Sequence, residues 1–232
     1  MFIKRVFGFI KRIFRVILRL DKTVSDYTKE VTSFDGRTAL KLTLNNGILA
    51  YQVSKDNKVL IKKSTLGISL KDDGLLGKNL LLVRAMEKTF DDTWETLWGE
   101  EREIRNHYRE IALYLVEKGK QNRLMTVRFI VFDEGVAFRY EIPAQPSFQK
   151  LAIEDEHTKF NVDGNSYAWV IPAFMSDRYE YNFDRESIYE IANSVHTPLT
   201  IETPNGYFLS IHEAALYDYG SMTIAATDRG EL

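Results

Sequence analysis

Hydrophobic and polar positions alternate along most of the chain after residue 33, which is typical of strands with one buried face. Ala39–Leu44 and Ile48–Ser54 alternate on either side of Asn46-Gly47, a dipeptide that favours a tight hairpin turn. Turn residues separate further segments of the same character: Val59–Ile61, Thr65–Leu70, Asn79–Arg84, Tyr108–Glu117, Arg123–Asp133, Val136–Ile142, Lys159–Val162, Ala168–Ile171, Leu199–Glu202, Tyr207–Glu213 and Met222–Ala226. These segments predict an all-β chain.

The length of this β region indicates its architecture. No long amphipathic helix and no internal repeat is present after residue 20. The acidic stretch Asp91–Arg105, which contains Trp94 and Trp98, predicts an irregular loop that crosses the sheet. Some two hundred residues of strand character are roughly twice an immunoglobulin-sized sandwich of about 100 residues. We therefore expect one large two-sheet β-sandwich over residues 33–232.

Residues 1–20 have a different character from the rest. They hold six basic residues and no acidic one, and the basic side chains share one arc of a helical wheel. The pattern predicts a basic amphipathic helix, either on a membrane surface or as a degraded leader. The charges exclude a transmembrane span, and the apolar runs are too short for a secretory signal. Residues 21–32 are polar and predict a linker or a short lead-in strand.

Composition removes several classes of function. The 232 residues carry a net charge of −2 and include no cysteine. Disulfides, thiolate zinc sites and cysteine nucleophiles are therefore excluded. The near-neutral charge argues against nucleic acid as a partner. The four histidines are not at metal-ligand spacing, and neither a phosphate-binding glycine loop nor a nucleophilic-serine motif is present.

Two places combine acids with residues that suit sugar or cation binding. Trp98 and Glu100 could face a sugar, with the indole stacked on the ring and the carboxylate bonded to hydroxyls, or they could belong to a buried crossover. His212 and Glu213 stand at the end of a predicted strand, where a carboxylate can bind a hard cation. Calcium needs about six to eight oxygen ligands, so Glu213 could not hold it alone, and a structural role remains open.

Three runs carry a resemblance to a known family. They are TWETLWGEEREIRNHYREIALYL at 93–115, VRFIVFDEGVAFRYEIP at 127–143 and TPLTIETPNGYFLSIHEAALYDY at 197–219. Together they resemble the N-terminal domain of glycoside hydrolase family 97, over roughly residues 33–226. The resemblance implies a galactose-mutarotase-like sandwich that precedes a catalytic (β/α)8 barrel and a small C-terminal β domain.

The resemblance also implies a function. Members of the family are exo-acting α-glucosidases or α-galactosidases that use calcium near the scissile bond. Both catalytic carboxylates belong to the barrel, so we expect no catalytic residue here, and the chain ends at Leu232, where the family would continue into that barrel. One glutamate of the N-terminal domain reaches the calcium, and we assign that role to Glu213. Trp98, Glu100 and His212 are the candidate contacts to an α-linked oligosaccharide.

Three hypotheses follow. The chain is the non-catalytic domain of a calcium-dependent α-glycosidase, truncated before the barrel, for which the family implies a periplasmic or outer-membrane-associated location. Alternatively, it is a stand-alone carbohydrate-binding module that uses Trp94, Trp98 and Trp169. The third hypothesis is a membrane-associated interaction protein directed by residues 1–20.

Overall fold

The computed structural model describes residues 23–119, 122–147, 150–175, 180–217, 219–227 and 232. Among them the fold is all-β, with one short 3-10 turn at Ile188–Glu190. The helix predicted for residues 1–20 lies outside the described residues. Within the described ranges, no helix has the length and apolar character needed to cross a membrane.

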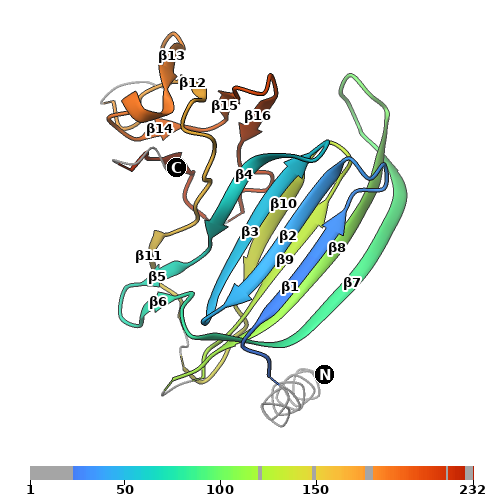
Figure 1. The fold of residues 1–232 in the computed structure, drawn as a ribbon, viewed down its shortest axis with the longest axis vertical. Coiled ribbons are helices and arrows are strands. Elements are labelled where there is room, and N and C mark those ends of the chain that lie inside the picture. Colours follow the sequence, from blue (N-terminus) through green and yellow to red (C-terminus); the bar gives the residue numbers. More distant parts are fainter. Residues whose placement is uncertain (1–22, 120–121, 148–149, 176–179, 218, 228–231) are drawn as a thin grey trace.

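Two antiparallel four-stranded sheets form the sandwich (Figure 1). The first sheet follows chain order and contains β1 (Tyr27–Thr32), β2 (Thr38–Asn45), β3 (Ile48–Lys55) and β4 (Lys58–Thr65). The second has the order β10-β9-β8-β7 and contains β7 (Leu80–Glu95), β8 (Glu103–Glu117), β9 (Leu124–Val131) and β10 (Val136–Glu141). The large sandwich expected from the sequence is confirmed.

The core lies between these two sheets. Leu40, Leu42 and Leu44 alternate along β2 and are almost fully buried, and so are Leu113 and Phe129 from the opposite sheet. Side chains at every second position of a strand share one face, so the alternation in the sequence becomes the apolar lining of the sandwich. Asn46 and Gly47 both have positive φ, 49° and 74°, as the hairpin turn between β2 and β3 requires.

Smaller sheets flank the sandwich. One has the order β11-β5-β6, with β11 (Ile153–Glu156), β5 (Ile68–Leu70) and β6 (Gly74–Leu76). The next has the order β13-β12-β15-β16, with β13 (Asp184–Ser187), β12 (Tyr167–Val170), β15 (Leu199–Glu202) and β16 (Phe208–Ile211). Finally, β14 (Val195–His196) pairs with β17 (Thr223–Ile224). Residues 167–224, here called the C-terminal region, share one continuous core with the sandwich through Leu199, Ile201 and Ile211.

The prediction of an irregular loop over Asp91–Arg105 is wrong. β7 and β8 pair continuously, apart from one bulge, from Leu80 opposite Glu117 to Glu95 opposite Glu103. The segment is thus the outer part of a long hairpin, which projects beyond the sandwich (Figure 1). The apolar alternation that marks a buried strand is absent because this part of the hairpin does not cover the core.

Other boundaries also differ from expectation. The second half of the segment expected as a linker, Tyr27–Thr32, is strand β1. Lys159–Val162 is not a regular strand, although the Lys159 N–H donates to the Thr65 carbonyl at 3.0 Å and the Lys62 N–H to the Asn161 carbonyl at 2.6 Å. This segment therefore runs along β4 without forming a full ladder.

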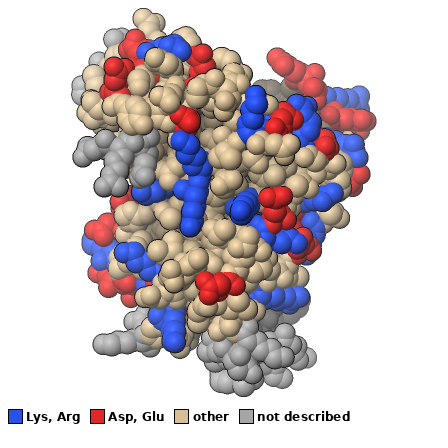
Figure 2. All heavy atoms as spheres, viewed as in Figure 1, with Lys and Arg blue, Asp and Glu red and all other residues tan. Residues whose placement is uncertain are grey.

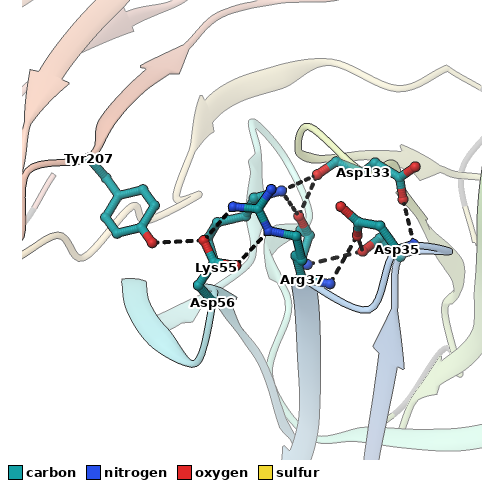
Figure 3. A network of polar contacts seen from close by, with 8 residues as sticks. Asp35, Arg37, Lys55, Asp56, Asp133 and Tyr207 are labelled. Carbon is teal, nitrogen blue, oxygen red and sulfur yellow. Dashed lines mark hydrogen bonds and ion pairs between the residues drawn. The ribbon is translucent and has the colours of Figure 1, made fainter.

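A polar network joins the turns at one end of the sandwich to the C-terminal region (Figure 3). The Arg37 guanidinium contacts both carboxylate oxygens of Asp56, at 2.7 and 2.9 Å, and the Tyr207 hydroxyl donates to Asp56 at 2.8 Å. The Asp35 N–H donates to Asp133 at 3.0 Å, and the Lys55 ammonium donates to the Asp133 carbonyl. Arg37, and after it Tyr207, hold the pKa of Asp56 well below its usual range. The network thus orients the C-terminal region relative to the two sheets.

Replacing Phe129 with alanine tests the core. Its side chain is fully buried and contacts Tyr51 and Phe138 at ring-centroid distances of 6.1 and 5.6 Å. We expect Phe129→Ala to lower the free energy of unfolding by about 3–5 kcal/mol in urea titrations, because it leaves a cavity. Leu97→Ala, at a fully exposed position of the hairpin, is the matched control and should change stability by less than about 0.5 kcal/mol. Equal effects of the two substitutions would contradict the assigned core.

Candidate functional site

Glu213 lies just beyond the end of β16, on the C-terminal region. The buried Ile211 anchors the strand end, with 7% of its surface exposed, and pairs with Leu199 of β15. His212 then points into solvent, and Glu213 is half-buried. Strand β16 ends at Ile211. The residues after it form a loop, in which Glu213 contacts Thr197 and Met222.

Two donors hold the Glu213 carboxylate in one orientation. The Thr197 hydroxyl donates to Oε2 at 2.8 Å, and the Met222 backbone N–H donates to Oε1. Thr197 precedes β15, whereas Met222 precedes β17, so two segments distant in sequence meet at this carboxylate. The two oxygens thus accept hydrogen bonds from different segments, and a carboxylate has about four lone-pair sites, so further ligands can bind.

The electrostatic surroundings keep Glu213 ionised. Partial burial alone would raise its pKa, but the Met222 N–H and the Thr197 hydroxyl bond to the charged form and outweigh burial. The net result is a pKa below the ordinary 4.5, with a smaller contribution from nearby His212. Glu213 is therefore a carboxylate at neutral pH, although no lysine or arginine pairs with it among the ion pairs of the described residues.

An oriented, ionised carboxylate without a cationic partner can bind a hard cation. Within the described ranges, however, no three acidic or histidine side chains gather as a metal site. A calcium ion at Glu213 would need most of its oxygen ligands from another part of the protein. Among the described residues, Glu213 thus offers a single carboxylate ligand at this place.

The remaining candidate residues occupy two places. His212 is adjacent to Glu213, and its Nδ1 lies 3.0 Å from the Glu213 carbonyl oxygen. Trp98 and Glu100 lie at the tip of the β7–β8 hairpin, and neither is among the polar partners that the structure describes for Glu213. Trp98 is 90% exposed, so the interpretation as a tryptophan buried in the core is wrong.

Sequence reasoning missed an exposed apolar surface on the C-terminal region. Leu216, Tyr217 and Tyr219 follow Glu213 closely and are exposed. Further exposed apolar residues of this region are Phe174, Met175, Phe183, Tyr189 and Phe208. Large exposed apolar side chains are typical of contact surfaces where they lie together. The signal available in the sequence was the run Ala214–Tyr217, which is apolar but does not alternate.

Comparison with known proteins gives these features a context. A family model described as Glycosyl-hydrolase 97 N-terminal matches residues 31–231. A retaining alpha-galactosidase of Bacteroides thetaiotaomicron is 19% identical over 210 residues, which are 85% of this chain and 30% of that protein.

Solved structures agree with this match. A glycoside hydrolase family 97 enzyme from Pseudoalteromonas sp. strain K8, solved with panose and with acarbose, is 31% identical with a TM-score of 0.83. The match covers 88% of this chain and 31% of that enzyme. A beta-arabinopyranosidase at 20% identity and a TM-score of 0.72 shares the fold. The chain spans about a third of the length of these relatives.

Removing the Thr197 hydroxyl should change the titration of Glu213. We expect Thr197→Val to raise the pKa of the Glu213 carboxyl, measured by carbon-13 NMR, because a hydrogen bond to the ionised form is lost. Since the folded-state pKa lies below 4.5, the pair stabilises the fold above that pH and loses its effect as the pH falls through the folded value. Stability at pH 7 should fall by about 1 kcal/mol.

The control is Thr200→Val, the same chemical change on β15 at a residue that faces Ser210. A pKa of Glu213 that is the same in Thr197→Val as in Thr200→Val would contradict the assigned contact.

Proposed function

This chain belongs to the glycosyl-hydrolase 97 N-terminal family, and we propose that it is the non-catalytic β-sandwich of an exo-acting, calcium-dependent α-glycosidase. In this role Glu213 supplies one ligand of a calcium ion whose other ligands come from a catalytic (β/α)8 barrel. The observation that carries the proposal is the oriented, ionised carboxylate of Glu213, which has no lysine or arginine partner among the ion pairs of the described residues.

The number of carboxyl groups that the reaction needs is consistent with a non-catalytic role for this chain. Hydrolysis of a glycosidic bond uses two carboxyl groups that flank the bond, about 5–10 Å apart. The described polar partners of Glu213 are the Thr197 hydroxyl and the Met222 amide, and neither is an acid. The calcium ion would polarise substrate oxygens and stabilise charge next to the scissile bond, whereas Thr197 and the Met222 amide hold Glu213 toward it.

The exposed apolar surface supports a large partner domain beside Glu213. Tyr217 and Phe174 are 85% and 81% exposed, and contact with another domain would bury them. The matched relatives are about three times the length of this chain, which leaves room for a barrel. The substrate is an α-linked oligosaccharide, and the Pseudoalteromonas enzyme solved with panose provides the precedent.

A chimera tests this function. Residues 31–231 would replace the matching part of the Pseudoalteromonas enzyme, to which they are 31% identical. We expect this chimera to hydrolyse an aryl α-glucoside, and Glu213→Gln to bind calcium at least about tenfold more weakly by calorimetry, because a neutral amide replaces a carboxylate ligand. The isolated 232-residue chain should show no turnover.

The matched control in the chimera is Glu202→Gln, since Glu202 is a carboxylate on β15 that pairs with Arg185. Thermal unfolding establishes that each variant is folded. Unchanged calcium affinity in Glu213→Gln, or turnover by the isolated chain, would contradict the proposal.

A stand-alone carbohydrate-binding module is the second candidate, because Trp98 and Trp94 expose 90% and 49% of their surfaces on the hairpin. An exposed indole can stack on a sugar ring. Calorimetric titration of the isolated chain with maltooligosaccharides distinguishes the candidates. The supporting-domain proposal predicts no heat at millimolar sugar, whereas binding that Trp98→Ala abolishes and Leu97→Ala preserves would favour the module.

A further inference from the structure

The free edge of β7 is an open site for strand pairing. β7 is 16 residues long and is the terminal strand of its sheet, at the outer border of the sandwich (Figure 1). On the side away from β8, Val24 bridges Leu82. From Arg84 to Glu95, the described part of the chain provides no further ladder partner on that side. Such an edge presents backbone N–H and C=O groups to a second strand.

The two faces of this edge differ in character. After the bulge between Leu82 and Arg84, Ala85 packs against the core and Glu87 pairs with Lys29 of the first sheet at 2.6 Å. Odd-numbered residues of β7 therefore face inward. Because side chains alternate along a strand, the even-numbered ones face outward. These are Met86, Lys88, Phe90, Asp92 and Trp94.

A row of aromatic rings on the outward face ends at the free edge. Phe90 stacks on Tyr108 with ring centroids 4.8 Å apart, and Tyr108 meets Phe132 edge-on at 5.0 Å. The three rings cross the sheet toward β7, and Phe90, the last of them, is half-buried. A strand added at this edge would cover Phe90 and could continue the row.

We propose that β7 pairs antiparallel with β7 of a second copy of this chain, about a two-fold axis that passes beside Phe90. An axis perpendicular to the sheet keeps the outward faces of both copies on the same side. Phe90 then faces Phe90 of the second copy, Lys88 faces Asp92, and Met86 faces Trp94. An aromatic pair, an opposite-charge pair and an apolar pair are the combinations that stabilise neighbouring strands. The two aromatic rows join into one.

Charge selects this register over its neighbours. With the two-fold axis beside Phe90, Glu87 faces Thr93 of the second copy. No like charges stand opposite each other between positions 85 and 95. Moving the axis by one residue places Glu87 opposite Asp91 or opposite Glu95, according to direction. If the axis moves by two residues, Lys88 stands opposite Lys88 of the second copy, or Asp92 stands opposite Asp92. Like charges directly opposite destabilise a strand pair, so the register about Phe90 is favoured.

The hairpin leaves these groups available for a second copy. Arg105 pairs with Asp91 at 2.7 Å, and Arg102 pairs with Glu95 at 3.3 Å. Acidic and basic side chains lie side by side at the projecting end of the hairpin (Figure 2). Among the ion pairs of the described residues, neither Lys88 nor Asp92 has a partner. Each is thus free to pair across the two-fold axis.

Charge exchange tests the proposed dimer. Sedimentation equilibrium should show the mass of the 26.9 kDa chain doubling with concentration. Lys88→Asp and Asp92→Lys should each weaken association about tenfold, because each creates two symmetric like-charge contacts. The double variant should restore it. Lys63→Asp, the same change at an exposed lysine of β4, is the control and should have no effect.

Cross-linking gives a second measurement of the register. The chain has no natural cysteine, so a single introduced thiol reports one position. Phe90→Cys should form an intermolecular disulfide on oxidation, whereas Thr93→Cys, about 20 Å from its own copy in this register, should not. A monomer at every concentration, equal cross-linking at both positions, or a dimer that disappears when residues 1–22 are deleted would overturn the proposal.

Discussion

The apolar core that continues from the sandwich into β15 and β16 determines where the polar groups of this chain lie. Leu199 and Ile201 are fully buried in the same cluster as Leu42 and Phe129. The end of β16 is consequently held by packing, and Glu213 follows it directly. The polar network around Asp56 adds orientation at the opposite turn, through Tyr207. Packing stabilises the fold. The hydrogen bonds to Asp56 orient the C-terminal region, and those to Glu213 orient its carboxylate.

Where the core dictates the pattern, the sequence predicts the strands well. Leu199–Glu202 is a strand with the predicted bounds, because its alternate residues enter the core. The outer half of β7 and β8 lacks that alternation, since it covers no core, and sequence reasoning mistook it for a loop. Short strands such as β14 depend on partners far along the chain and leave no local signal. The family was predictable from the three runs that resemble it, and the family model matches residues 31–231, which contain all three.

The candidate site was only partly predictable because it depends on residues that are distant in the sequence. The end of a predicted strand drew attention to Glu213, but its donors, Thr197 and Met222, are 16 and 9 residues away in the sequence. Their convergence depends on the pairing of β14 with β17 and of β15 with β16. A carboxylate held by neutral donors retains its negative charge for a cation, whereas a salt bridge would have neutralised it. This distinction separates a ligand from a structural ion pair, and it depends on contacts that form only in the folded chain.

In the proposed function, Glu213 is one ligand of a shared calcium ion. Crystallography of the chimera with the Pseudoalteromonas barrel, using the anomalous signal of calcium, tests it most directly. We expect a calcium ion about 2.3–2.6 Å from a Glu213 carboxylate oxygen, with its remaining oxygen ligands from the barrel. A folded, calcium-loaded chimera in which the ion lies beyond ligand distance of Glu213 would contradict it.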